Sequence, residues 1–90
     1  MLHVNIRISG QVQGVFFRGS AQNKADELDI QGFARNEPDG TVYIEAESDD
    51  QAALDEFIAW CKVGPPSAEV DEVSVASGAY SNLKRFFISH

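Results

Sequence analysis

The chain has almost none of the residues that form covalent or metal cross-links, and it has no long apolar segment. Cys61 is the only cysteine among its 90 residues, which excludes an intrachain disulfide and a metal site made of several thiolates. No apolar run approaches the roughly 20 residues of a membrane-spanning helix, and the first residues lack the pattern of a signal peptide. We therefore expect one domain, residues 1–90, with no membrane association and a cytoplasmic location.

Basic residues are also scarce. Seven Lys and Arg residues stand against fourteen Asp and Glu residues, which gives a net charge of −7. Such a field repels polyanions, so a nucleic-acid partner is not expected, and any anionic ligand must be small and held by local charge. The acidic residues gather in 45–56 and 69–72, whereas residues 1–24 contain none. An anion site is therefore favoured in the N-terminal part of the chain.

Several familiar catalytic patterns are missing as well. His3 and His90 lie near the two ends of the chain, with no H-x-x-x-H spacing and no carboxylate cluster that joins them, so we expect no metal site and no cofactor. The sequence contains no G-x-S-x-G, no G-x-x-x-x-G-K-[ST] and no G-x-G-x-x-G motif. Without an obvious nucleophile, metal or histidine base, any reaction catalysed here must be intrinsically easy.

Hydrophobic periodicity predicts the order strand, helix, strand, strand, helix, strand, followed by a short final strand. Val4, Ile6 and Ile8, for example, alternate with polar residues, as in a strand with one buried face. The expected elements are a strand around 4–8, a helix from 19 or 20 to 28, strands 30–35 and 41–47, a helix after 48–51, and strands 68–77 and 85–89. This order predicts a ferredoxin-like α/β sandwich of the α+β class, with both helices on one face of a mostly antiparallel sheet.

Local signals support these boundaries. Residues 37–40, Glu-Pro-Asp-Gly, are typical of a hairpin turn, and Gly-Pro-Pro at 64–66 should end the second helix. Ser48 and Gln51 have the spacing of a capping box at the start of that helix. Apolar residues follow at helical spacing and should face the core, so that Cys61 is expected to be a buried thiol: Leu54, Phe57, Ile58 and Cys61.

The loop 10–18 joins the first strand to the first helix and has the features of an anion site. Its glycines allow backbone N–H groups to converge, the helix N-terminus adds partial positive charge, and Arg18 can add a full charge with several donors. The predicted phosphate-binding backbone groups are those of Gln13, Gly14, Val15, Phe16, Phe17 and Arg18. Alternatively, Gly10 and Gly14 are only turn residues, and Arg18 caps a carbonyl or is solvated.

Asn36 is the second candidate, because it precedes the hairpin turn. An acyl phosphate would suit this pair of features, since its carboxylate leaves without protonation, and a carboxamide can orient the attacking water by accepting one hydrogen bond and donating another. Alternatively, Asn36 only forms an Asx-type turn. Phe16, Phe17 and Phe33 are expected in the core, although Phe16 could line the mouth of a ligand site.

With these residues in place, the sequence resembles the acylphosphatases. Residues 10–18, with Gly10, Val12-Gln13-Gly14-Val15 and Phe17-Arg18, match the family's signature G-x-V-Q-G-V-x-F-R. Residues 32–42 match most of a second signature, G-[aromatic]-[small]-x-N-x-x-x-G-x-V, and 57–66 resemble the family's second helix and its end. Two differences are Ser48, where many members have glycine, and the small residues Gly19-Ser20 after the arginine.

The resemblance implies a metal-independent hydrolase that splits a small acyl phosphate into a carboxylate and inorganic phosphate. It assigns phosphate binding to Arg18 and the 13–18 backbone, and orientation of the water to Asn36. In the family, an oxygen of the substrate's phosphate is commonly proposed to accept the proton of the water. We expect a monomer. A non-catalytic anion-binding or maturation module remains the main alternative, and an RNA-recognition module on the same fold is a more distant one, which would need exposed aromatic residues on a basic sheet face.

Overall fold

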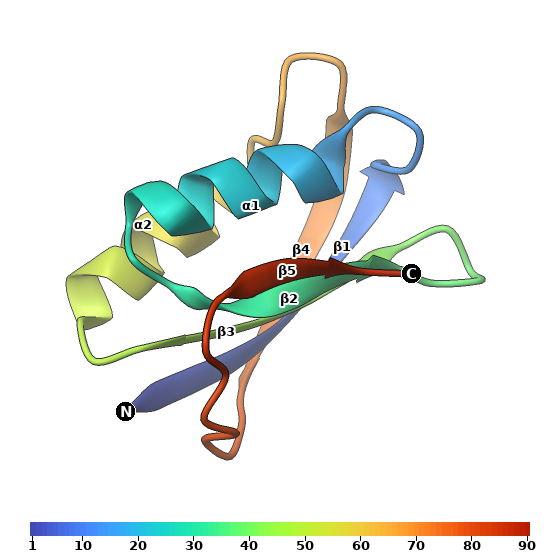
Figure 1. Cartoon of the computed structure of the whole chain (residues 1–90). Coiled ribbons are helices and arrows are strands. Elements are labelled where there is room, and N and C mark those ends of the chain that lie inside the picture. Colours follow the sequence, from blue (N-terminus) through green and yellow to red (C-terminus); the bar gives the residue numbers. More distant parts are fainter.

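The computed structural model describes residues 1–90 as five strands and two helices (Figure 1). In chain order these are β1 (Leu2–Gln11), α1 (Phe17–Glu27), β2 (Gln31–Asn36), β3 (Val42–Ser48), α2 (Gln51–Cys61), β4 (Glu69–Ser77) and β5 (Phe86–Ser89). The predicted order of elements is confirmed. Neither helix has the length and apolar character that a membrane crossing requires.

The strands form a single sheet in the order β4-β1-β3-β2-β5. β1 is antiparallel to β3 and β4, and β2 is antiparallel to β3, whereas β5 runs parallel to β2 at the edge. Both helices cover one face of this sheet (Figure 1), which confirms the predicted ferredoxin-like sandwich. The β1–α1 loop, the β2–β3 hairpin and the end of β5 all lie at the same end of the sheet (Figure 1).

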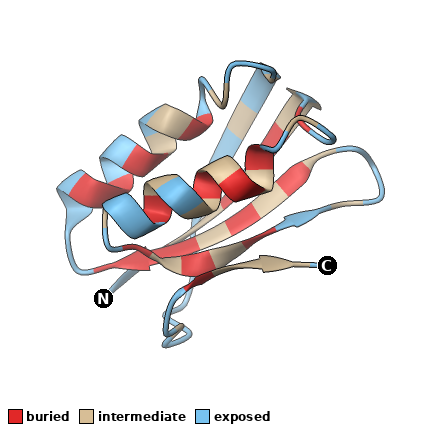
Figure 2. Ribbon diagram, turned by 45° about the horizontal axis from the view of Figure 1, so that its top comes forward, coloured by how far each residue is buried: buried red, intermediate tan, exposed pale blue.

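The core fills the space between the helices and the covered sheet face (Figure 2). Ile6 and Ile8 of β1 and Ile44 of β3 are completely buried, because alternate residues of a strand point to the same face. The predicted apolar stripe of α2 meets them with Leu54 and Phe57, which are also inaccessible to solvent. Burial of this alternating pattern is what holds the two layers together.

Helix α1 begins two to three residues earlier than predicted. Phe16 precedes it with φ 62° and ψ 30°, a left-handed conformation, and α1 then starts at Phe17. Phe17 is buried and packs against Trp60 of α2, with ring centroids 5.3 Å apart, so tertiary contact sets this boundary.

The predicted capping box of α2 is wrong. The N-cap is Asp50, whose side chain accepts a hydrogen bond from the Ala52 N–H at 2.9 Å. Ser48 is the last residue of β3, and its hydroxyl accepts a hydrogen bond from the Asp50 N–H at 3.0 Å. Ser48 therefore shapes the turn before the helix, while an aspartate two residues later, an equally good capping type, caps the helix itself.

β1 is longer than the predicted strand around 4–8, by two residues at its start and three at its end, and the boundaries of the other strands agree with the predictions to within about one residue. In the hairpin turn, Gly40 has φ 92° and donates its N–H to the Glu37 carbonyl at 3.1 Å, as the Pro-Asp-Gly pattern predicts. β4 is an edge strand, paired only with β1, and its valines are only partly covered, with Val75 44% exposed. Its Asp71 and Glu72 keep charge on this edge, which disfavours pairing with another chain.

The three phenylalanines predicted for the core divide between three environments. Phe17 is in the core, as predicted, whereas Phe16 is 71% exposed. Phe33 is half-buried on the sheet face away from the helices, where its ring stacks on Phe87 and lies near Tyr43. Cys61 is the expected buried thiol, and burial raises the pKa of that thiol.

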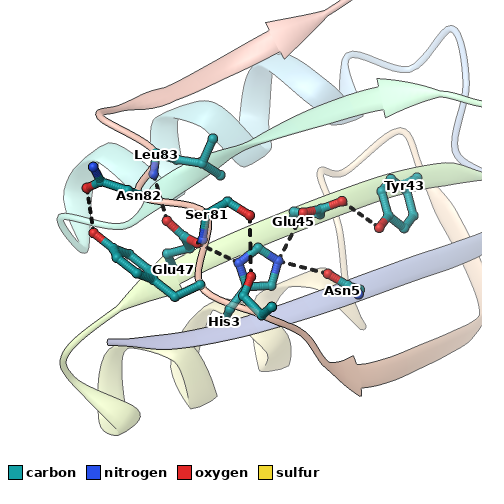
Figure 3. A network of polar contacts seen from close by, with 10 residues as sticks. His3, Asn5, Tyr43, Glu45, Glu47, Ser81, Asn82 and Leu83 are labelled. Atoms are coloured by element: carbon teal, nitrogen blue, oxygen red, sulfur yellow. Dashed lines mark hydrogen bonds and ion pairs between the residues drawn. The ribbon is translucent and has the colours of Figure 1, made fainter.

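His3 is the centre of a buried polar network, which the sequence analysis did not foresee (Figure 3). Its Nδ1 lies 2.6 Å from Glu47 Oε2, and its Nε2 lies 2.9 Å from Asn5 Oδ1 and 2.9 Å from Glu45 Oε1. The strand register places Glu47 directly opposite His3 although the two are far apart in the sequence. Nowhere in the structure do three or more His, Cys, Asp or Glu side chains form a group that could hold a metal ion.

Glu47 is completely buried and joins the network to the chain between β4 and β5 (Figure 3). Besides His3, it accepts hydrogen bonds from the Ser81 N–H and, at 2.8 Å, from the Leu83 N–H. Burial by itself raises the pKa of Glu47, but these hydrogen bonds and the charge of His3 lower it overall. Burial likewise lowers the pKa of His3, yet its bonds to Glu47 and Asn5 and the nearby carboxylates raise it overall. Both shifts favour the charged forms of the pair, an imidazolium beside a carboxylate.

Candidate active site

A pocket of about 250 Å³ opens where the β1–α1 loop, the end of β2 and the end of β5 come together. Both predicted side chains, Arg18 and Asn36, line this pocket. Gly14, Phe16 and Phe17 of the predicted loop line it as well, whereas Gln13 and Val15 do not. The other lining residues, which the sequence analysis did not single out as site residues, are Val12, Gly19, Ile88 and His90.

The backbone of the loop leaves its N–H groups free. Ser20 is the first residue after β1 whose N–H donates a hydrogen bond to a carbonyl of the chain, that of Phe16 at 3.0 Å. The N–H groups of 13–19 therefore have no partner in the chain. The left-handed conformations of Gly14 (φ 76°) and Phe16 (φ 62°) curve this segment at the N-terminus of α1, the arrangement in which successive N–H groups form an anion-binding concavity.

Arg18, the second residue of α1, is half-buried and directed toward the end of β5. Its Nη1 lies 3.4 Å from the Ser89 carbonyl oxygen and 3.4 Å from His90 Nδ1. Arg18 therefore does not cap a carbonyl of its own loop or helix, which was the alternative expected from the sequence. The two contacts are long, so the guanidinium keeps most of its donor capacity for a ligand in the pocket.

Asn36 is the last residue of β2, opposite Val42 of β3, and is exposed. Its carboxamide makes no hydrogen bond within the chain, so the alternative role as an Asx-turn residue is wrong. Asp39 has that role instead: its carboxylate accepts hydrogen bonds from the N–H and the hydroxyl of Thr41, which lower its pKa. The carboxamide of Asn36 is therefore free to bind a ligand or water.

Gln13 takes part through its side chain, which the sequence analysis did not foresee. Its Nε2 donates to the Glu37 carbonyl at 2.8 Å and to the Thr41 carbonyl at 2.9 Å. These bonds join the loop directly to the hairpin that follows Asn36. The sequence shows only that the loop contains a long amide side chain. Its hydrogen-bond partners lie in the hairpin, more than twenty residues away, and only the tertiary structure brings them close.

No aspartate or glutamate lines the pocket, and Arg18 is its only lysine or arginine. The nearby hairpin acids are already engaged, since Glu37 pairs with Arg35 at 2.7 Å and Asp39 with Thr41. The hydrogen bond to Glu37 raises the pKa of Arg35. A negatively charged ligand would thus meet local positive potential in a molecule whose overall charge is −7.

The model of the acylphosphatase family matches residues 4–88, almost the whole length of the chain. The chain belongs to the acylphosphatase family. It is 43% identical over 83 residues to the acylphosphatase of Nocardioides sp., with 92% of this chain and 83% of that relative covered. The acylphosphatase of Archaeoglobus fulgidus is 40% identical over 90 residues, and both chains are covered completely.

Solved structures agree with the sequence relatives. The acylphosphatase from Bacillus subtilis superimposes with a TM-score of 0.96 at 36% identity and covers 100% of both chains. Full-length HypF in its phosphate- and nucleotide-bound form matches with a TM-score of 0.87 at 30% identity, over 99% of this chain but 12% of that one. The enzyme is thus an acylphosphatase, a hydrolase of acyl phosphates, and the predicted family, fold and activity are confirmed.

Proposed function

We propose that this acylphosphatase binds the phosphoryl group of a small acyl phosphate with Arg18 and the backbone N–H groups of 13–18, while Asn36 orients the attacking water. The observation that supports the proposal is the meeting of both side chains and the free N–H groups of the helix N-terminus in one pocket. Charge and donors placed in advance around a reacting phosphoryl group lower the barrier because they need no rearrangement during the reaction.

The reaction needs little further help from the protein. The water oxygen forms a bond to phosphorus while the bond between phosphorus and the acyl oxygen breaks, and its electron pair leaves with the carboxylate. That leaving group is stable as an anion, so no general acid is required. We propose that an oxygen of the substrate's phosphate accepts the proton of the water, as the family resemblance implies.

His90 offers a test of this proton path, because it is the only imidazole that lines the pocket. If the substrate accepts the proton, replacing His90 with glutamine lowers kcat only a few-fold. If His90 were instead the general base, its loss would lower kcat by roughly 10²–10⁴-fold.

Metal independence is part of the proposal, because Arg18 and the backbone amides supply the charge neutralisation that a divalent cation gives to many phosphoryl-transfer enzymes. Hydrolysis of benzoyl phosphate by the wild-type chain should therefore be unchanged by a chelator. Inorganic phosphate, the product, should compete with the substrate. A loss of activity with the chelator that added metal restores would contradict this part of the proposal.

Substitutions test the two assigned side chains. Arg18→Ala and Asn36→Ala should each lower kcat/KM for benzoyl phosphate by about a hundredfold or more, with unchanged unfolding midpoints. Arg85→Ala and Asn23→Ala are matched controls, since both residues are exposed and neither lines the pocket. Near-normal kcat/KM in either pocket variant would show that the assigned role is wrong. If the two pocket variants lose activity and the two controls keep it, the result also argues against a non-catalytic anion-binding module.

The single domain over 1–90, the monomeric state and the cytoplasmic location stay predictions. The cytoplasmic location is supported by the one cysteine, which is free and buried. The monomeric state is supported by the charged residues on the exposed edge of β4. Sedimentation of the purified chain would test the monomeric state.

A further inference from the structure

We propose that Phe16 selects the acyl part of the substrate, so that the enzyme prefers acyl phosphates with a flat, apolar acyl group over those that carry a second negative charge. The inference rests on the proposed function, because it assumes that the phosphoryl group binds at Arg18. It concerns a residue between the fixed positions of the first signature, which the proposed chemistry uses only through its backbone N–H.

The placement of Phe16 is costly by ordinary packing standards. Its side chain is 71% exposed, whereas the ring of the neighbouring Phe17 is buried in the core. Its backbone is left-handed, with φ 62°, a conformation that residues with bulky side chains rarely adopt. An exposed aromatic ring on a strained backbone contributes little to the core. Its role therefore lies in the pocket that it lines.

Gly19 explains how the ring is held. A Cβ atom at position 19 would lie only 2.4 Å from Cζ of Phe16 and 2.5 Å from its Cε1, so the ring rests directly on the Gly19 backbone. The backbone of Gly19 is ordinary helix, and glycine lowers helix stability there, so its benefit is the space that it leaves for the ring. This accounts for Gly19, the first of the two small residues after the arginine that distinguish the chain from many family members.

Two further apolar residues line the pocket, of which Val12 is almost completely buried. Val12 and Ile88 line the pocket with Phe16, and Arg18 is the only lysine or arginine there. Once Arg18 binds the phosphoryl group, an anionic group at the far end of the acyl chain would find no lysine or arginine to pair with it. The net charge of −7 adds further repulsion. A planar apolar acyl group, in contrast, can stack on the exposed ring.

The test compares three substrates with the full chain: benzoyl phosphate, acetyl phosphate and succinyl monophosphate, whose far end is a carboxylate. The wild type should have the highest kcat/KM for benzoyl phosphate and the lowest for succinyl monophosphate. In Phe16→Ala, the ratio of kcat/KM for benzoyl to acetyl phosphate should fall roughly three- to tenfold, the range expected for the loss of one aromatic stacking contact. Phe16→Tyr, which keeps the ring, should retain the wild-type ratio.

Gly19→Ala is a second, independent variant, because the added methyl group must displace the Phe16 ring without removing it. It should lower the same ratio, whereas Val63→Ala, at an equally exposed apolar residue that lies outside the pocket, should not change it. An unchanged ratio in both Phe16→Ala and Gly19→Ala, or equal hydrolysis of benzoyl and succinyl phosphates by the wild type, would overturn the inference. If the wild type hydrolysed none of the three substrates, the proposed function would fail, and this inference with it.

Discussion

At the scale of single residues, the side chain of Gln13 links the two parts of the chain that carry the proposed catalytic side chains. Its amide donates hydrogen bonds to the carbonyls of Glu37 and Thr41, and these bonds fasten the loop that we propose binds phosphate to the hairpin turn after Asn36. Arg18 and Asn36 come from different elements, α1 and β2, so their relative position depends on links of this kind. A displacement of about 1 Å in such a pair is enough to slow a reaction strongly.

We therefore predict that Gln13→Ala lowers kcat/KM for benzoyl phosphate by about tenfold. Because both hydrogen bonds are exposed, the free energy of unfolding should fall by only about 1 kcal/mol. Steady-state kinetics and urea unfolding measure the two effects. Gln11→Ala is the control, since Gln11 is also exposed and its side chain makes no hydrogen bond. Equal kinetics in the two variants would show that the link does not position the site.

At the scale of elements, the two helices begin for different reasons, α1 through tertiary packing and α2 through a local side-chain cap. α1 begins where Phe17 enters the core against Trp60, and α2 begins where Asp50 caps its N-terminus. The start of α1 matters for function, because it decides which N–H groups remain unpaired and turn toward the pocket. The start of α2 follows the end of β3 that lies away from the hairpin (Figure 1), and no residue of α2 lines the pocket.

Replacing the N-cap of α2 tests this assignment. Asp50→Ala should lower the free energy of unfolding by about 1 kcal/mol, because the Ala52 N–H loses its acceptor. Gln51→Ala should cost only a few tenths of a kcal/mol, since Gln51 makes one exposed contact, with Asp55. Urea unfolding of both variants measures the difference, and a larger loss in Gln51→Ala would revive the capping box of Ser48 and Gln51.

At the scale of the whole molecule, the His3–Glu47 pair connects parts of the chain that are distant in sequence. It joins β1 to β3, and through the Ser81 and Leu83 N–H groups it fixes the path from β4 to β5. β5 in turn brings Ile88 and His90 to the pocket. The network thus supports the site from the opposite end of the sheet, through the connection that leads into β5.

The pair should make stability depend on pH in a defined direction. The pKa of His3 is raised above its ordinary value of 6.5, so the stabilisation is complete below pH 6.5 and is lost as the pH rises through the raised pKa. The pKa of Glu47 is lowered below 4.5, so its contribution is complete above pH 4.5 and is lost as the pH falls through the lowered pKa. The contribution of the pair is therefore greatest between pH 4.5 and 6.5.

Urea unfolding from pH 5 to pH 9 measures this profile. The wild type should lose stability above pH 6.5, and His3→Gln should remove most of that decline while lowering stability at pH 6. His90→Gln, which removes the other histidine, is the matched control and should leave the slope in place. Equal slopes in the wild type and His3→Gln would show that the pair does not carry a charge on His3.

Much of the fold could be predicted from the sequence because its signals are local. The alternation around Val4, Ile6 and Ile8, the spacing of Leu54, Phe57 and Cys61 and the turn at 37–40 each depend on neighbours within a few residues. The capping box of α2 was wrong for a local reason, the cap by Asp50, but the start of α1 and the place of Phe33 were decided by distant contacts. Phe17 starts α1 early because it meets Trp60, and Phe33 leaves the core because the sheet register turns it to the open face.

The sequence by itself determined the two-layer fold, the family and the identity of Arg18 and Asn36 as candidates, because periodicity and fixed motifs are properties of adjacent residues. Only the tertiary structure decided that His90, Ile88 and Phe16 form the rim of the same pocket and that His3 and Glu47 are a buried ion pair. These groups are brought together by strand register and by the parallel pairing of β5 with β2. Those long-range pairings leave no periodic trace in the chain.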